Sequence, residues 1–413
     1  MIAYIFPPLA GAGTFRSYAF AKHLVNLGWK VAIISADDPE WVAAERDEFP
    51  PIPGVEQKRI KMGPYSSLDG LTRRFFVPEA SHDFPDDRMP WITRVIRHLI
   101  LKRRLYSDVD VVFTTSYPYS DHMAGLVMKR TFGTPWVADF RDPWFDNAIF
   151  MERKSNDFKQ RTLGLERIVL ESADKIVVVA PTMKETMLSR HKGLDESRIE
   201  VVTNGYDEED FRDVKPKARN EFTILFIGEQ YGSRSPEPLL SAYLEFCNLI
   251  QESSAVTLRI VGTRDAKIQR VYETFVKENP WARVEIENRV SHGEAISEML
   301  GADVLVYILG DGESITKSVY PGKVFEYLAA RKPILGIAPH GQTGELVERL
   351  GAGRNFEGSQ KSDIASYLRV LFQEYLSSGH LKAPPQSDIS IFSREHLTAK
   401  LDSVLREAMK KHL

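Results

Sequence analysis

The chain has 413 residues, 43% hydrophobic and 27% charged, which is ordinary for a soluble globular protein and long enough for two domains. A net charge of −3 argues against nucleic acid as an electrostatic partner, and the single cysteine, Cys247, excludes an internal disulfide and a cysteine metal centre. The N-terminus lacks the basic lead of a signal peptide and no apolar run is long enough to cross a bilayer, so we expect a cytoplasmic protein.

Strand-like and helical segments alternate through the first half of the chain. A short apolar run at residues 2–6 is followed by a glycine loop, an amphipathic helical pattern and a second apolar run, which together indicate a βαβ unit. The same order returns further along. The predicted strands are residues 2–6, 31–36, 110–116, 135–140, 175–180 and 199–205.

A polar stretch without periodicity, residues 207–220, interrupts this order and predicts a linker. It separates an N-terminal Rossmann-like domain, residues 1–206, from a C-terminal one, residues 221–390. A long helical pattern at residues 391–413 could pack back across the hinge. Strands of the second domain are predicted at residues 222–228, 256–262, 283–290, 302–309 and 333–337, with a helix at 236–252.

The segment 91–106 combines an apolar stripe with several basic residues. Val95, Ile96, Leu99 and Ile100 recur at helical spacing. Two interpretations stay open: an ordinary surface helix that packs this stripe on the core, favoured here, or a helix that lies on an anionic membrane surface.

A second amphipathic segment begins at Pro321-Gly322. Proline suits the first helical position, and glycine lets a ligand approach the free N–H groups, which with the helix dipole form an anion site. Val324 and its apolar neighbours define one side of this helix, and Glu326 falls opposite, near Lys323. Glu326 therefore either accepts hydrogen bonds from vicinal hydroxyls or forms an exposed ion pair with Lys323.

The stretch FEYLAARKPILG (residues 325–336), the N-terminal IFPPLAGAGTF and the run ADFRDPW (138–144) resemble glycosyltransferase family 4, in particular a bacterial subgroup with the last motif. The resemblance extends over nearly the whole chain. It implies an α/β protein of the GT-B fold, in which two Rossmann-like domains with parallel sheets face each other across a cleft.

By this resemblance, the second domain binds a nucleotide-sugar donor. Glu326 would bind the ribose, amides at Pro321–Val324 the diphosphate, and Arg289 and Val290 would flank the base. Gly228 is assigned to the same site, and Arg234 and Lys323 are candidates for charge compensation. Ser318 stands where the family usually has a second glutamate, and the nearest alternative carboxylates are Asp311 and Glu313.

In the first domain, candidate residues follow the strand ends. Gly11 and Gly13 suit a close backbone approach to the donor phosphate or the acceptor, with a plain tight turn as the alternative. A dinucleotide fingerprint is disfavoured, since GAGTFR ends in arginine where glycine is required.

Three further residues are candidates for catalysis. Asp139 could orient or deprotonate a hydroxyl and Arg141 could hold an anion, or the two could belong to a structural ion-pair cluster. His122 is either an acid–base group or a core neighbour.

The expected function is transfer of a sugar from a UDP- or GDP-linked donor to a glycan, lipid-linked or small-molecule acceptor, in cell-envelope polysaccharide or other glycan synthesis. The resemblance implies retention of configuration. We expect no cofactor and no obligatory metal, because no D-x-D motif lies in a loop. A nucleotide-sugar epimerase and a non-catalytic binding homologue stay open as alternatives, as does peripheral contact with the inner membrane surface.

Overall fold

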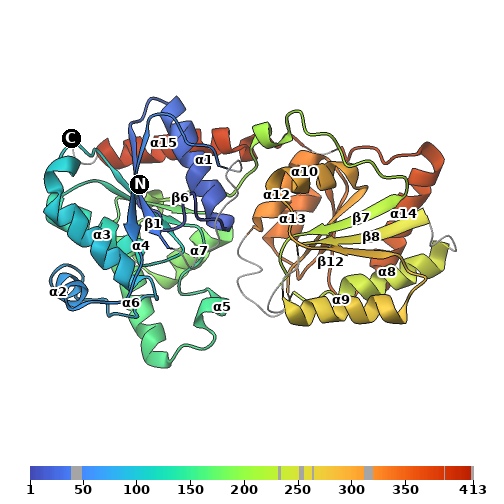
Figure 1. Ribbon diagram of the computed structural model, residues 1–413, viewed down its shortest axis with the longest axis horizontal. Helices are drawn as coiled ribbons and strands as arrows, with labels where there is room; N and C mark the ends of the chain where they lie inside the picture. Colours follow the sequence, from blue (N-terminus) through green and yellow to red (C-terminus); the bar gives the residue numbers. More distant parts are fainter. Residues whose placement is uncertain are drawn as a thin grey trace. The chain divides into compact units, whose positions relative to one another are not determined.

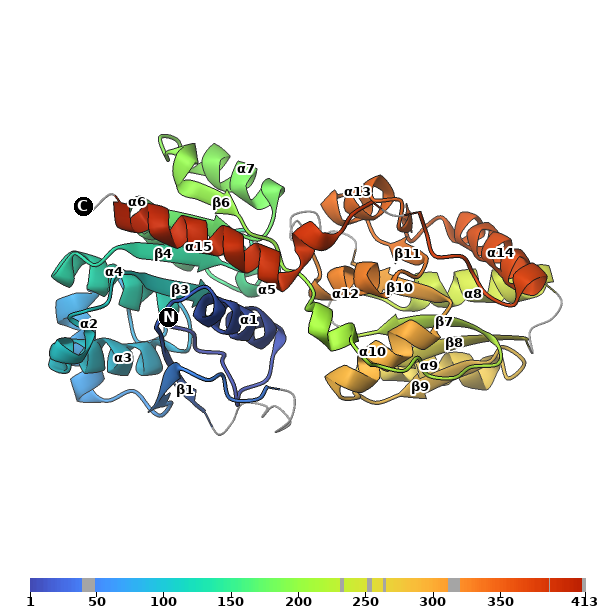
Figure 2. The ribbon, with the colours of Figure 1, turned by 90° about the horizontal axis from the view of Figure 1, so that it is seen from above.

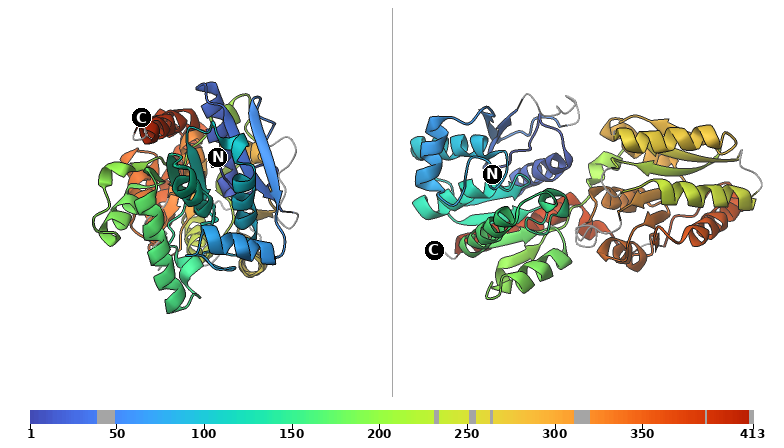
Figure 3. Two further views of the ribbon diagram at one scale, coloured as in Figure 1. Left: turned by 90° about the vertical axis from the view of Figure 1, so that its left-hand side faces the viewer. Right: turned by 90° about the horizontal axis from the view of Figure 1, so that it is seen from below.

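The computed structural model describes residues 1–38, 49–230, 234–250, 255–262, 265–310, 320–385 and 387–410 (Figure 1). The chain forms two compact units. Unit 1 contains Met1–Asn204 and Arg394–Leu413, and unit 2 contains Gly205–Ser393. The N-terminal segment and the last helix therefore lie together in unit 1 (Figure 3).

Unit 1 is built on parallel strands, β1 (Val31–Asp37) with β2 (Val55–Lys61), and a four-stranded sheet in the order β3-β4-β5-β6. The strands of that sheet are β3 (Val112–Ser116), β4 (Trp136–Phe140), β5 (Lys175–Val178) and β6 (Ile199–Val201).

The N-terminal segment joins the two groups of strands, since Ile2 forms bridges to Ile34 and to Thr114. The strand predicted at residues 2–6 is seen only as these bridges. The amide of Tyr4 donates to the Asp121 carboxylate at 2.8 Å, where a continued ladder would use a carbonyl of β3.

Helices cover both faces of the strands in unit 1 (Figure 2). Helices α1 and α15 pack on one face, where Leu397, Leu401 and Leu405 of α15 join the buried core. Helices α3, α4 and α6 belong to the opposite side. The helices of unit 1 are α1 (Ala12–Asn26), α2 (Ser67–Phe76), α3 (Met89–Leu101), α4 (Asp121–Phe132), α5 (Ala148–Met151), α6 (Asn156–Ser172), α7 (Pro181–Arg190) and α15 (Arg394–Lys410), with 3-10 turns η1 (Arg103–Tyr106) and η2 (Glu196–Arg198).

Unit 2 is a six-stranded parallel sheet in the order β12-β11-β10-β7-β8-β9. Helices α8, α9 and α14 form the core with one face, while α10, α12 and α13 cover the other (Figure 1). The strands are β7 (Phe222–Ile227), β8 (Val256–Val261), β9 (Val284–Glu287), β10 (Val304–Ile308), β11 (Ile334–Ile337) and β12 (Gly353–Phe356). The helices are α8 (Glu237–Ile250), α9 (Ala266–Glu278), α10 (His292–Gly301), α12 (Gly322–Ala330), α13 (Gln342–Arg349) and α14 (Lys361–Ser378), with 3-10 turns η3 (Glu208–Phe211) and η5 (Ser390–Phe392).

The polar stretch after Gly205 is fastened to unit 2 along its length. It contains η3, and Tyr206 donates its amide to the Phe392 carbonyl at 3.1 Å. Further on, Lys217 donates its amide to the Ser297 carbonyl at 3.0 Å and its ammonium to Glu298. The segment therefore follows the surface of one unit as an ordered strap.

Candidate functional site

Helix α12 begins at the carboxyl edge of the unit 2 sheet. The buried Tyr327 hydroxyl donates to the Val306 carbonyl of β10 at 3.1 Å and reaches the Ile227 carbonyl of β7 at 3.3 Å, which fixes the helix over these two strands. Pro321 is the N-cap residue and not the first helical residue that the sequence predicted, because its ψ of 132° is extended and α12 starts at Gly322. It has no side-chain acceptor for the first-turn amides, so the positive end of the helix lacks a side-chain cap.

Two glycines keep space in front of the strand ends and of α12. A Cβ added to Gly322 or Gly228 would meet no atom of the described residues within 4 Å. Gly228 has a φ of +146°, which glycine alone adopts readily. The described residues thus leave backbone groups approachable at the carboxyl edge of the sheet, where ligands bind in open α/β folds.

Glu326 is buried, with 6% of its surface exposed, so the ion pair with Lys323 that was weighed from the sequence as an exposed pair has an enclosed carboxylate. Most of this short helix is enclosed, so the side opposite Val324 is covered as well. Its carboxylate accepts a hydrogen bond from the Lys323 ammonium at 2.6 Å, and the Lys323 side chain is 34% exposed. In this arrangement the buried carboxylate can accept hydrogen bonds from hydroxyl groups. The more accessible ammonium and the first-turn amides of the helix can bind an anion at the same time.

The remaining predicted donor residues lie on loops around the same edge of the sheet. Arg289 is exposed and Val290 half-buried, directly after the edge strand β9, and Arg234 is half-buried before α8. Strand spacing places the end of β9 roughly 10 Å from that of β7. Asp311, Glu313 and Ser318 fall outside the described residues.

In unit 1, Arg141 lies against the first turn of α1. A Cβ on Gly13 would come within 2.1 Å of Arg141 Nη1, so Gly13 is required for the guanidinium to approach the helix. Arg141 donates through Nη2 and Nε to Asp142, at 2.9 and 3.1 Å. Gly11 is the N-cap residue and supplies no side-chain cap. Gly11, Gly13 and Arg141, which the sequence singled out separately, thus lie together at one helix N-terminus.

Asp139 is fully buried and belongs to a structural ion pair, in line with the non-catalytic alternative. Its carboxylate binds Arg16 through Nη2 at 2.7 Å and Nε at 3.1 Å, and it accepts a hydrogen bond from Thr115 at 2.7 Å. Arg16 also donates to the Val202 and Thr203 carbonyls. The partner of Asp139 is therefore Arg16 and not Arg141, and the proposed role of Asp139 in deprotonating a hydroxyl finds no support in this geometry.

His122 is also fully buried, which argues against the acid–base role considered from the sequence. Its Nδ1 pairs with the Thr114 hydroxyl at 2.8 Å, and its ring packs 4.5 Å from that of Phe140. Burial lowers the pKa of His122 to about 3, so the imidazole is neutral at physiological pH. The core interpretation of His122 fits these contacts.

Sequence reasoning missed Arg16 and Tyr327, although both hold the candidate residues in place. Arg16 occupies the position that disqualified the dinucleotide fingerprint, and that departure from the pattern was the available signal. Tyr327 lies within the amphipathic helix pattern, and no local feature of the sequence predicts the hydrogen bonds of its hydroxyl.

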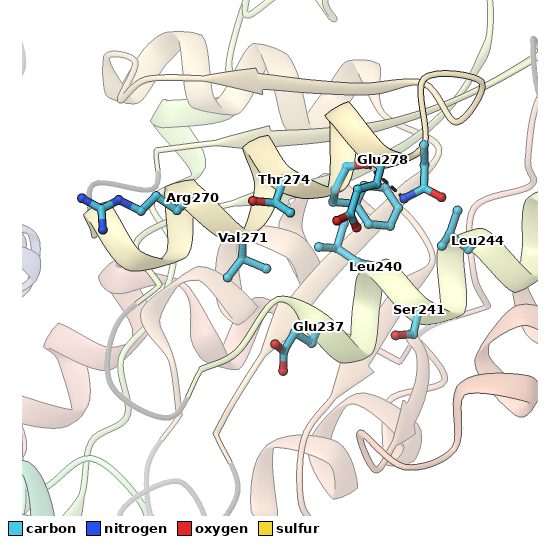
Figure 4. Close-up of a pocket in the computed structure, with 10 residues that line it drawn as sticks. Glu237, Leu240, Ser241, Leu244, Arg270, Val271, Thr274 and Glu278 are labelled. Atoms are coloured by element: carbon cyan, nitrogen blue, oxygen red, sulfur yellow. Dashed lines mark hydrogen bonds between the residues drawn. The ribbon is translucent and has the colours of Figure 1, made fainter.

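A surface groove of about 430 Å³ lies elsewhere in unit 2, between α8 and α9 (Figure 4). Glu237 and Leu240 contribute from α8, and Arg270 and Thr274 from α9. The described residues contain no group of three His, Cys, Asp or Glu side chains arranged to hold a metal ion. The expectation of a metal-independent reaction stays a prediction.

The first half of the chain is similar to a known protein family. Residues 15–210 match the model of Glycosyltransferase Family 4. Over 416 aligned residues, the chain is 25% identical to D-inositol 3-phosphate glycosyltransferase of Rhodococcus opacus (strain B4), an alignment covering 94% of this chain and 84% of that protein.

Solved structures of similar fold superpose on nearly the whole chain. Sucrose-phosphate synthase from Thermosynechococcus elongatus superposes with a TM-score of 0.65 at 16% identity and 99% coverage of both chains. Anabaena Alr3699/HepE in complex with UDP-glucose gives a TM-score of 0.64 at 13% identity, covering 98% of this chain and 99% of that one. The protein has the α/β GT-B fold. The family model and the curated relative support glycosyltransferase activity of the family 4 type.

Proposed function

We propose that the protein is a retaining glycosyltransferase that moves a sugar from a nucleotide-diphosphate sugar to an acceptor hydroxyl, without an obligatory metal, in the synthesis of cell-envelope polysaccharide or another glycan. One observation carries the proposal. The uncapped N-terminus of α12 opens at Gly322 onto space free of described atoms, and the Lys323–Glu326 pair lies one turn inside.

The chemistry required of such a site is stabilisation of the leaving diphosphate. The first-turn amides of α12 and the Lys323 ammonium supply hydrogen bonds and positive charge for this purpose. When the donor binds, Lys323 turns from Glu326 to the phosphate, and the Glu326 carboxylate accepts hydrogen bonds from the ribose hydroxyls. Arg289, Val290 and Arg234 line the approach to the base and the phosphates.

In unit 1, Arg141 at the uncapped start of α1 is the residue best placed to hold an anionic group of donor or acceptor. Asp142 fixes the guanidinium through two hydrogen bonds, and its own charge limits the net positive potential there. The acceptor is a glycan, a lipid-linked glycan or a small-molecule alcohol.

Acceptor-dependent release of nucleotide diphosphate tests the proposal. UDP-glucose is the first donor to assay, because a neighbour of the same fold was solved with it, and GDP-sugars follow. Pooled glycan and lipid-linked acceptors should stimulate release, chelator should leave turnover intact, and the product should keep the anomeric configuration of the donor. Interconversion of the donor sugar without acceptor would indicate an epimerase, and donor binding without either reaction would indicate a binding homologue.

A further inference from the structure

Helix α2 of unit 1 turns its apolar side outward. Leu68 and Leu71 are each 53% exposed and Phe75 is 72% exposed, whereas Asp69 is fully buried. Residues 68, 71 and 75 recur at the spacing of one helix face. An ordinary surface helix has the reverse arrangement, with its apolar face on the core.

Ion pairs to a buried carboxylate hold α2 in this orientation. The Asp69 carboxylate accepts from Arg97 at 3.0 Å and from Arg94 at 3.4 Å, both on α3. It also completes a capping box with Ser66 at the start of α2. The helix is thus fixed beside α3 (Figures 1 and 2). Its apolar side is exposed.

The end of α3 and the turn η1 continue the exposed apolar surface. Leu101 is 73% exposed and Leu105 is 72% exposed. Leu101 follows Arg94 and Arg97 on one face of α3, the face that α2 borders through Asp69. His98 and the Tyr106 hydroxyl lie 2.8 Å apart, which holds η1 back against α3. Of the stripe weighed from the sequence for membrane contact, Val95, Ile96 and Leu99 are by contrast buried and Ile100 is half-buried.

Basic residues lie next to these exposed apolar side chains in the sequence. Residues 67–76 and 101–106 contain a single carboxylate, Asp69, which is buried in its ion pairs. The basic run ends where Asp108 follows η1. We call this set the α2–η1 surface; its apolar members are Leu68, Leu71, Phe75, Leu101 and Leu105, and its basic members are Arg73, Arg74, Lys102, Arg103 and Arg104.

We propose that the α2–η1 surface docks unit 1 on an anionic lipid bilayer. Exposed apolar side chains with neighbouring cations match the boundary between acyl chains and anionic headgroups. A second copy of the chain is a poorer occupant, because a two-fold contact would place the same cations against one another. Within the described parts of the chain, no helix is long and apolar enough to cross a bilayer, so the contact is peripheral. The proposal is independent of the transferase reaction.

Vesicle flotation of the full-length protein tests this inference. We expect binding to vesicles of equal parts phosphatidylcholine and phosphatidylglycerol, and little binding to phosphatidylcholine alone. The double variant Leu71→Ser/Phe75→Ser should bind about tenfold more weakly, because the inserted apolar area is lost. The double variant Arg103→Glu/Arg104→Glu should show a similar loss, and added salt should weaken binding of the unmodified protein.

Matched controls come from α14 of unit 2. Val370→Ser/Leu376→Ser removes two side chains that are 59% and 56% exposed, and Lys361→Glu/Arg369→Glu reverses two exposed charges. Both controls should bind vesicles like the unmodified protein. The proposal would be overturned if the α2–η1 variants bound vesicles as strongly as the unmodified protein. It would also be overturned if the unmodified protein bound neutral and anionic vesicles equally. So would self-association, followed by light scattering, that the α2–η1 variants abolish in the absence of lipid. A melting temperature close to that of the unmodified protein verifies that each variant is folded.

Discussion

Asp139 and Arg16 lie far apart in sequence and form one buried bidentate ion pair in unit 1. Both side chains are almost fully shielded from solvent, at 0% and 5% exposure. Each charge therefore depends on the other for compensation. Through Arg16, the pair connects α1 to β4 and to the chain that follows β6.

Asp139→Asn should destabilise the fold by about 3–5 kcal/mol, since Arg16 is left buried with an uncompensated charge. The midpoint of urea unfolding measures this. Asp142→Asn is the matched control: Asp142 is 34% exposed, and its pairing with Arg141 should be worth about 1 kcal/mol or less. An unchanged midpoint for Asp139→Asn, together with a collapse in turnover, would return Asp139 to a catalytic role.

Glu326→Ala should weaken nucleotide binding by about 1–3 kcal/mol, because the ribose loses hydrogen bonds to a charged acceptor. Titration calorimetry with UDP and GDP measures the change. Glu273→Ala, at an exposed position on α9, should bind like the unmodified protein. Equal nucleotide affinity in the Glu326 and Glu273 variants would exclude the ribose contact.

At the scale of elements, the apolar strands were predictable and two polar edge strands were not. The runs at 222–228, 256–262 and 302–309 contain β7, β8 and β10, which are buried on both faces. Strands β2 and β12 have sequences VEQKRIK and GRNF, which are mostly exposed or half-buried and show no apolar period. Their strand conformation depends on pairing with β1 and β11, which no local pattern encodes.

The candidate site was likewise predictable from the sequence only in part. The α12 N-terminus and the position of Arg141 after β4 follow from local order, because helices begin and strands end at recognisable residues. The burial of Glu326 and the pairing of Asp139 with Arg16 depend on tertiary contacts. Residues that make such contacts can lie far apart in the sequence, so a single sequence does not reveal the contacts.

Glu298 of α10 joins the strap after Gly205 to the sheet of unit 2. It accepts hydrogen bonds from Arg259 of β8 and from Lys217 and Arg219 of the strap. Burial by itself would raise the pKa of Glu298, but these three cations outweigh it and lower the pKa to about 2. Gly301 is also needed there, because a Cβ would lie 2.3 Å from the Lys217 carbonyl oxygen.

A depressed folded-state pKa means that Glu298 stabilises the fold above its ordinary value of 4.5 and loses this contribution as pH falls toward 2. Stability of the unmodified protein should therefore decline as the pH falls from about 4.5 to about 2. Glu298→Gln should be less stable at neutral pH and show a flatter decline. Urea midpoints across this pH range measure both. Parallel declines in the two proteins would contradict the assigned charge pairing.

At the scale of the whole molecule, the end of the chain completes unit 1. Leu401 of α15 is fully buried, and Asp402 accepts from the Trp29 indole at 2.6 Å. Leu401→Ala should cost about 2–5 kcal/mol of stability, because it leaves a cavity between α15 and the core. Lys400→Ala, at an exposed neighbouring position, should change stability by less than about 0.5 kcal/mol.

Tryptophan fluorescence can show in which unit Leu401→Ala lowers the stability. Trp91, Trp136 and Trp144 are buried in unit 1, whereas Trp281 of unit 2 is 47% exposed. The fluorescence change on unfolding should therefore report mainly on unit 1 and shift to lower denaturant in Leu401→Ala. An unshifted tryptophan transition would show that α15 contributes little to that unit.

The most direct test of the account is a crystal or cryo-electron microscopy structure of the protein with bound UDP or GDP. We predict that the diphosphate lies within hydrogen-bond distance of the α12 first-turn amides and the Lys323 ammonium, with the ribose hydroxyls on Glu326. A nucleotide bound elsewhere, or an α12 N-terminus covered by protein, would contradict the central claim.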